Sequence, residues 1–170
     1  YDLAGVDITA QSTIGTSEFT AYSFADSRTQ AIGGYTQAIW RQFYDNINRC
    51  NIIIDALENA IGTDQEKGHI RGQAKAIRAI SYFQLILNYQ QTYGYAKNKR
   101  GVILRLHSDD SEFMSFSTVE QVYAQIVKDL EDAKSELSDY DPGNVWRIRT
   151  DVVCAWLARV HQVMGNWNEA

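Results

Sequence analysis

The stretch Gln73–Gly94, QAKAIRAISYFQLILNYQQTYG, decides the fold of this chain. Apolar residues recur along it in steps of three and four, the spacing of one helix face: Ala74, Ile77, Ile80, Phe83 and Leu87. A second apolar row runs through Ala79, Tyr82, Ile86, Tyr89 and Tyr93. A helix that is apolar on two sides packs against neighbours on both. We therefore expect a long helix that ends at Gly94, lies between other helices and has Lys75 and Arg78 at its polar edge.

A first helix is expected before it, from Thr36 to Ile61. Its apolar residues again step by three and four, at Trp40, Phe43, Ile47, Cys50, Ile54, Leu57 and Ile61, and Gly62 follows as a stop. Asn51 lies beside this row, and we expect its amide to bond to a neighbouring backbone. Thr63–Glu66, TDQE, has the form of a capping box and starts the second helix. The short link predicts an antiparallel hairpin over residues 36–93.

A second hairpin is expected over residues 117–165. Ser117–Glu120 forms another capping box, and an apolar row continues to Leu137. The fourth helix has Thr150 and Asp151 as its cap and Gly165 at its left-handed end. Residues 166–170 are expected to begin a further, truncated helix. The pattern predicts an all-α fold of stacked helical hairpins with packing like that of tetratricopeptide (TPR) repeats, an α–α superhelix, in a single domain spanning 1–170.

Two segments lack a helical period. Residues 1–34 are irregular and carry scattered aromatic side chains, which suit either a packed lid or a binding loop. The connector from Tyr95 to Met114 contains an apolar run at Val102–Leu104, expected to be extended over the helices. Its acidic residues Asp109, Asp110 and Glu112 lack the glycine and terminal glutamate of a calcium-binding loop, so we expect no metal there.

The composition excludes several classes of protein. A net charge of −5 over 170 residues argues against a nucleic-acid-binding face. Cys50 and Cys154 both lie in helical patterns, and we expect two buried thiols. No run of 18 apolar residues occurs, so nothing in the sequence is expected to span a membrane. The chain has no initiator methionine, and it is expected to be a piece of a longer protein.

No pattern typical of an active site is present. The three histidines, His69, His107 and His161, share no metal-ligand spacing, and no nucleophile or phosphate-binding motif occurs. The carboxylates of Asp129, Glu131 and Asp132 are expected on the solvated side of the third helix, where they would do no catalysis. We therefore expect no enzyme activity, no metal and no cofactor. The aromatic residues instead suit a glycan or a protein partner.

Four segments, in order, resemble the SusD/RagB family of outer-membrane nutrient-binding lipoproteins. They are WRQFYDNINRCNIII at 40–54, AIRAISYFQL at 76–85 with the later Tyr93-Gly94, STVEQVYAQIVKDLEDA at 117–133 and AWLARVHQVMGNWNEA at 155–170. The family patterns are W-x-x-x-Y-x-x-I-x-x-x-N-x-x-I, RA-x-x-YF-x-L, S-T-V-x-E-V-Y-x-x-I-x-x-D-L-x-x-A and A-x-x-L-A-R-V-Y-x-x-x-G-x-W-x-x-A. The turn after Tyr93-Gly94 lacks the family's proline.

The resemblance implies the N-terminal, TPR-containing part of an outward-facing outer-membrane lipoprotein, anchored by a lipid upstream of this chain. Such a protein binds oligosaccharides or peptides and works with a SusC-like TonB-dependent transporter. Ligand contacts in the family come partly from loops before the first helix. The candidates here are therefore Phe19, Tyr22, Phe24, Arg28 and Tyr35. The alternative is a TPR-like scaffold that binds only protein.

Overall fold

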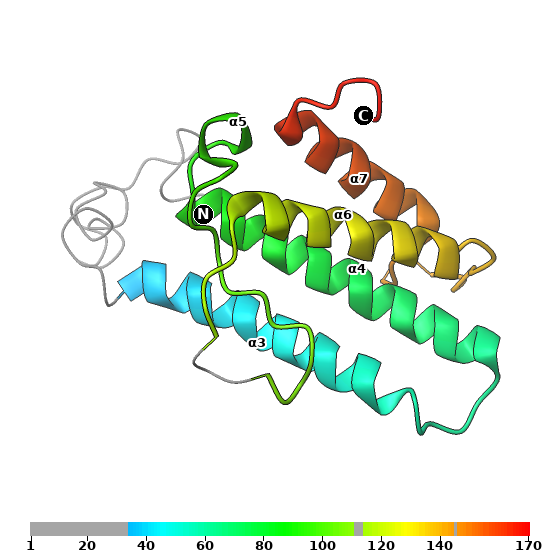
Figure 1. Cartoon of the computed structure of the whole chain (residues 1–170). Helices are drawn as coiled ribbons and strands as arrows, with labels where there is room; N and C mark the ends of the chain where they lie inside the picture. The colour runs from blue at the N-terminus through cyan, green and yellow to red at the C-terminus, as the bar shows by residue number, and fades with distance from the viewer. Residues whose placement is uncertain (1–33, 111–113, 145) are drawn as a thin grey trace, which may run out of the picture. The chain divides into compact units, whose positions relative to one another are not determined.

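The computed structural model describes residues 34–110, 114–144 and 146–170 (Figure 1). Helices within these residues are α3 (Gly34–Ala56), α4 (Asp64–Tyr89), α5 (Tyr93–Ala96), α6 (Val119–Glu136) and α7 (Thr150–Met164). The described residues contain no strand beyond one isolated bridge, so the predicted all-α class is confirmed. The chain divides between Gln42 and Phe43, and the packing described below lies within Phe43–Ala170.

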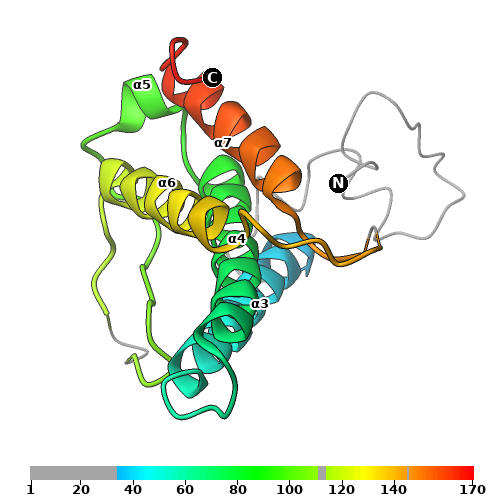
Figure 2. The ribbon, with the colours of Figure 1, turned by 90° about the vertical axis from the view of Figure 1, so that its right-hand side faces the viewer.

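Helix α4 is the centre of this unit. It lies between α3 and α6, and α7 packs on α6 beyond it (Figures 1 and 2). The side chains of Tyr82, Phe83, Leu85 and Ile86 are all buried. Because these four neighbouring residues span little more than one turn and point in several directions, α4 must be covered on more than one side. The prediction that this helix is packed between neighbours is confirmed.

The first helix is shorter than its apolar row. Ile47, Cys50 and Leu57 are buried as predicted, but α3 ends at Ala56 and Ile61 is fully exposed. The prediction that Ile61 belongs to the buried row is wrong, because the chain leaves the helix before reaching it. The α3–α4 turn therefore carries a large apolar side chain in solvent.

Helix α4 begins where the sequence predicts and ends earlier. The Thr63 hydroxyl accepts from the Glu66 N–H at 3.2 Å, and the Thr63 N–H donates to the Glu66 carboxylate at 2.9 Å, so the capping box is confirmed. The predicted end at Gly94 is wrong. Gln90 is extended, and residues Tyr93–Ala96 form the separate short helix α5.

Gly72 explains how closely α4 and α6 approach. A Cβ atom at Gly72 would lie 2.9 Å from Leu137 Cγ, whereas nothing lies within 4 Å of a Cβ at Gly68. Glycine costs a helix about 1 kcal/mol relative to alanine. At Gly72 the helix bears this cost, but the missing side chain lets α4 approach Leu137 more closely than a larger residue would allow.

The start of α6 is held by the segment after α5. Its cap is Thr118 with Gln121, one residue later than the predicted Ser117–Glu120 box, which is therefore wrong in register. Backbone N–H groups of the first turn donate to the carbonyls of Lys97 and Lys99, both at 3.0 Å. These bonds satisfy donors that a helix start leaves unpaired.

Helix α7 ends as predicted and begins differently. Gly165 is left-handed, with φ of 81°, which confirms the glycine stop. The cap residue is Arg149, without a side-chain capping bond, and the predicted cap Thr150 donates instead to the Leu137 carbonyl at 2.6 Å. That bond ties the start of α7 to the end of α6. Residues 167–169 form a turn, with the Glu169 N–H bonded to the Asn166 carbonyl at 3.1 Å.

The two cysteines differ in exposure. Cys50 is buried and Cys154 is exposed, so the prediction of two buried thiols holds for Cys50 alone, and both thiols are free. Burial raises the pKa of Cys50 to about 11. Among the helices described, none is long and apolar enough to cross a membrane.

Candidate functional site

A buried ion pair joins three helices. Arg78 on α4 donates from Nε and Nη2 to the two carboxylate oxygens of Asp129 on α6, both at 2.8 Å, and from Nη1 to Asn51 Oδ1 on α3 at 2.9 Å. Only 5% of Arg78 and 1% of Asp129 are exposed. The predictions of a polar-edge Arg78 and a solvated Asp129 are therefore wrong, because each group is buried against the other.

The same side chains bind the connector between α5 and α6. Asn51 Nδ2 donates to the carbonyls of Arg105 and His107 at 3.0 and 3.3 Å, which confirms the predicted backbone contact of its amide. Arg78 Nη1 also donates to the Leu106 carbonyl at 3.0 Å. The carbonyls of residues 105–107 therefore supply further acceptors for the buried cluster.

Two tyrosines repeat this arrangement along the connector. The Tyr44 hydroxyl donates to the Ile103 carbonyl at 2.8 Å and accepts its N–H at 3.0 Å. The Tyr82 hydroxyl does the same with Arg105, both at 2.7 Å. Burial raises the pKa of Tyr44 to about 12, so the hydroxyl stays protonated as a donor. With Val102 fully buried and residues 102–104 outside any helix, the predicted path of this segment over the helices is confirmed.

The acidic residues near this turn act as backbone acceptors. Asp110 accepts the N–H groups of Leu106 and His107 at 2.6 and 3.0 Å, and Asp55 accepts the N–H of Ser108 at 2.7 Å. Among the residues that the structure describes, no three histidine, cysteine, aspartate or glutamate side chains are grouped to hold a metal. Glu112 lies outside the described residues.

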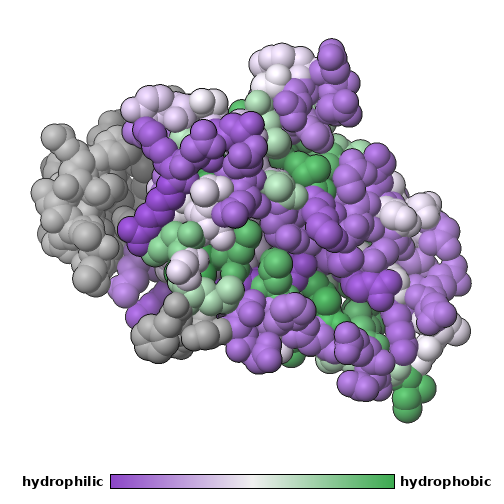
Figure 3. Space-filling view, in the orientation of Figure 1, coloured by the Kyte–Doolittle hydropathy of each residue, from purple (hydrophilic) through white to green (hydrophobic). Residues whose placement is uncertain are grey.

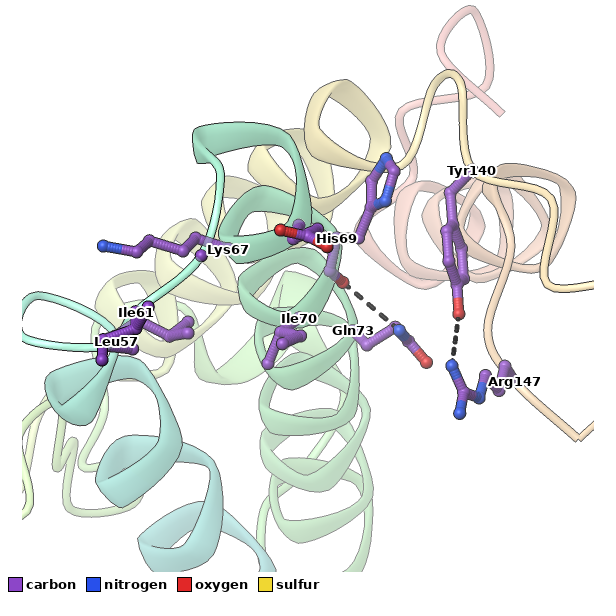
Figure 4. A pocket seen from close by; sticks show the side chains of 11 residues that line it. Leu57, Ile61, Lys67, His69, Ile70, Gln73, Tyr140 and Arg147 are labelled. Carbon is purple, nitrogen blue, oxygen red and sulfur yellow. Dashed lines mark hydrogen bonds between the residues drawn. The ribbon is translucent and has the colours of Figure 1, made fainter.

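A pocket of about 380 Å³ opens at the end of the α3–α4 hairpin (Figure 4). It is formed by the end of α3, the α3–α4 turn, the first turns of α4 and the link from α6 to α7. We call it the hairpin pocket, and its lining residues are Leu57, Ala60, Ile61, Gly62, Glu66, Lys67, His69, Ile70, Gln73, Tyr140 and Arg147. Figure 3 shows an apolar group projecting from this end of the molecule, at the α3–α4 turn.

The α6–α7 link is tied to α4 beside this pocket. The rings of His69 and Tyr140 lie 4.7 Å apart, and His69 Nε2 lies 2.8 Å from an Asp139 carboxylate oxygen. The other oxygen of Asp139 accepts from Gln65 Nε2 at 2.6 Å. Arg147 Nη1 donates to the Tyr140 hydroxyl at 3.0 Å. These contacts fix one wall of the pocket on the helix that forms its floor.

The lining of the hairpin pocket contains one carboxylate and two cations, Lys67 and Arg147. Its one acidic lining residue, Glu66, is held by the Thr63 cap, and the nearby Asp139 is held by Gln65 and His69. In the part of the chain that the structure describes, neither Lys67 nor Arg147 forms a salt bridge within 4.0 Å. The pocket therefore presents two cations without a salt-bridge partner beside the apolar side chains of Ile61 and Ile70.

The structure does not test the contact residues predicted from the sequence. Phe19, Tyr22, Phe24 and Arg28 are outside the described residues, and Tyr35 lies in the first turn of α3 with its side chain undescribed. They stay a prediction. Sequence reasoning missed the hairpin pocket, whose walls are some 80 residues apart in the chain. The available signal was Ile61, an apolar residue directly before a glycine and a helix cap.

Known proteins are similar to this chain in sequence and architecture. A family model described as "Starch-binding associating with outer membrane" matches residues 5–161. A SusD-like carbohydrate-binding protein from Bacteroides vulgatus aligns at 27% identity with a TM-score of 0.86. The alignment covers 99% of this chain and 36% of the relative's chain. Among curated proteins, none matches the sequence.

Two further solved structures are similar. A SusD superfamily protein from Bacteroides thetaiotaomicron aligns at 27% identity with a TM-score of 0.70, over 76% of this chain and 29% of its own. A laminarin-binding SusD-like protein aligns at 26% identity with a TM-score of 0.65, over 78% of this chain and 28% of its own. This chain spans about a third of the length of these relatives. On the match over residues 5–161 and the shared helical architecture, the chain belongs to the SusD-like family.

Proposed function

We propose that this chain is part of the nutrient-binding component of an outer-membrane uptake complex, binding oligosaccharides and working with a TonB-dependent transporter. The observation that carries the proposal is the family match over residues 5–161, since that family is described as starch-binding and associating with the outer membrane. The role is binding and delivery, without catalysis.

Two similar structures support a glycan as the ligand. One relative is a laminarin-binding SusD-like protein at 26% identity, and another is a SusD-like carbohydrate-binding protein at 27% identity. Each is about three times as long as this chain, so the transporter partnership and the outward-facing, lipid-anchored location are part of the proposal. A peptide ligand is the alternative within the same role.

We assign the ligand contacts to the residues before and at the start of α3: Phe19, Tyr22, Phe24, Arg28 and Tyr35. Aromatic rings offer flat apolar faces to sugars, and their polar tips bond to hydroxyl groups. An arginine adds several fixed donors for sugar oxygens. The unit Phe43–Ala170 serves as a scaffold, because its polar side chains are used to hold its own connector.

The test is a titration of the chain with soluble laminarin oligosaccharides, malto-oligosaccharides and a mixed peptide pool, followed by intrinsic fluorescence and calorimetry. We expect saturable binding of at least one glycan, weakened tenfold or more by Tyr22→Ala with Phe24→Ala. Trp146→Ala is the matched control, since Trp146 is an exposed aromatic residue outside the assigned contacts. Its affinity should equal that of the wild type.

Two results would overturn parts of this proposal. Binding of glycans by neither this chain nor a longer parent protein, with binding of protein partners retained, would favour the protein-only scaffold. Glycan binding that survives substitution of all five assigned residues would place the ligand elsewhere in the chain.

A further inference from the structure

We propose that the hairpin pocket is a docking site for a polypeptide segment in which acidic residues flank an apolar one. The proposal stands on the pocket alone and does not depend on the glycan-binding function. It names a second surface of the chain, made entirely of described residues between Leu57 and Arg147.

The apolar part of the pocket argues for a protein partner. Ile61 is fully exposed and Ile70 is 47% exposed, and both line the same hollow as the buried Leu57. Trp146, next to Arg147 in the α6–α7 link, is 89% exposed. Large apolar side chains gathered on one exposed surface, as Ile61 and Ile70 are, mark interaction sites. Tryptophan is enriched among the residues that contribute most to protein binding, and Trp146 is next in the sequence to a lining residue.

The charges of the pocket argue for acidic groups on that partner. In Figure 4, Lys67 and Arg147 lie on opposite sides of Ile70. The nearby carboxylates of Glu66 and Asp139 already accept bonds within the protein. The chain as a whole carries a charge of −5, so a pocket with two unmatched cations runs against its composition. A segment crossing α4 can place a carboxylate at each cation and an apolar side chain over Ile70.

The same features disfavour a sugar as the occupant. Glycans stack on exposed ring faces, and the one tyrosine of the pocket, Tyr140, has its ring against His69 and its hydroxyl bonded to Arg147. The remaining apolar lining is aliphatic or small. Aliphatic side chains pack against other side chains, and guanidinium groups form paired hydrogen bonds with carboxylates.

The probe is an array of ten-residue peptides in which leucine, phenylalanine or tryptophan lies between aspartate and glutamate residues. Counterparts with lysine and arginine in place of the acids are printed beside them. The best acidic peptide is then titrated against the full chain by calorimetry, and by intrinsic fluorescence if the peptide has no tryptophan. Oligogalacturonate, an acidic sugar, is titrated in the same way.

Two pairs of variants locate the site. Lys67→Gln with Arg147→Gln removes both pocket cations, and Lys134→Gln with Arg49→Gln removes two exposed cations elsewhere. Ile61→Asp with Ile70→Asp replaces two apolar lining side chains by carboxylates. Ile52→Asp is the control for this change, since Ile52 is a 50% exposed isoleucine on α3. We expect the pocket variants to lose tenfold or more in peptide affinity and the controls to stay within twofold.

Four outcomes would overturn the proposal. They are saturation by no acidic peptide, equal binding of the basic counterparts, equal losses in the control variants, and oligogalacturonate binding that the pocket variants abolish. The last would assign the pocket to acidic sugars. A urea unfolding curve for each variant separates loss of binding from loss of fold.

Discussion

Arg78 and Arg147 show two different uses of the same side chain. Arg78 is buried and bonds to Asp129, Asn51 and the connector backbone with three of its nitrogens. Arg147 is exposed and donates to the hydroxyl of Tyr140. A buried cation requires a fixed carboxylate, which commits it to the structure. An exposed cation with no carboxylate near it keeps that capacity for a partner.

The first prediction is the largest effect and concerns the buried pair. Arg78→Met leaves the Asp129 carboxylate buried without its partner, and breaking such a pair costs about 3–5 kcal/mol. We expect the urea midpoint to fall accordingly and the connector to lose protection from hydrogen exchange. An Arg78→Met variant as stable as the wild type would show that the pair does not hold the helices together.

A double variant sharpens this result. Arg78→Met with Asp129→Leu removes both charges, so no ion stays buried alone, and such replacements recover much of the loss. We expect the double variant to be more stable than Arg78→Met. Equal or greater destabilisation would mean that the bonds to Asn51 and Leu106 matter more than the charge pair.

The second prediction uses two glycines of α4 as a matched pair. Gly72→Ala places a Cβ 2.9 Å from Leu137 Cγ, and overpacking of this kind costs about 1–3 kcal/mol. Gly68→Ala meets nothing within 4 Å and should gain about 0.5–1 kcal/mol through helix propensity. Opposite signs in the two urea midpoints are expected. Two stabilised variants would show that α4 and α6 adjust freely at Gly72.

Sequence periodicity predicted the helices because their apolar residues repeat with the helix. Ile47 and Cys50 show this for α3, and the capping box of Thr63 marked the start of α4. It missed the early ends of α3 and α4. A helix ends where the chain must turn to reach its next contact. Helix α4 ends in this way, because the backbone becomes extended at Gln90, before α5.

The burial of Asp129 could have been predicted from the sequence, but its partner and the hairpin pocket could not. Asp129 lies three residues after Ile126 and four before Ala133, within the buried row of α6, so its position carried a signal. Its partner is 51 residues away, and no local pattern joins them. The hairpin pocket depends on how the α6–α7 link returns to α4, through contacts such as His69 with Tyr140.

The third prediction is a pH dependence of the connector. Backbone hydrogen bonds lower the pKa of Asp55, through Ser108, and of Asp110, through His107. A carboxyl with a lowered folded-state pKa stabilises the fold above its unfolded pKa, and this is lost as pH falls through the folded value. In the Asp55→Asn, Asp110→Asn double variant, the urea unfolding midpoint should fall less than in the wild type as the pH is lowered below about 4. The same pH dependence in the variant and the wild type would contradict this prediction.

The fourth prediction is the smallest effect and completes the comparison. Lys67→Gln with Arg147→Gln should leave the urea midpoint unchanged, because neither cation has a carboxylate partner among the described residues. Exposed charges away from such partners contribute little to stability. A clear loss of stability would give these cations a structural role and remove the contrast with Arg78.

The most direct test is hydrogen exchange, read by mass spectrometry, of the chain with and without the glycan that binds it in titration. The account predicts protection of fragments from residues 19–35 and no change in the fragments from 57–73 and 140–147 that form the hairpin pocket. Adding an acidic peptide should protect the pocket fragments alone. Glycan protection of the pocket with none at residues 19–35 would contradict both assignments.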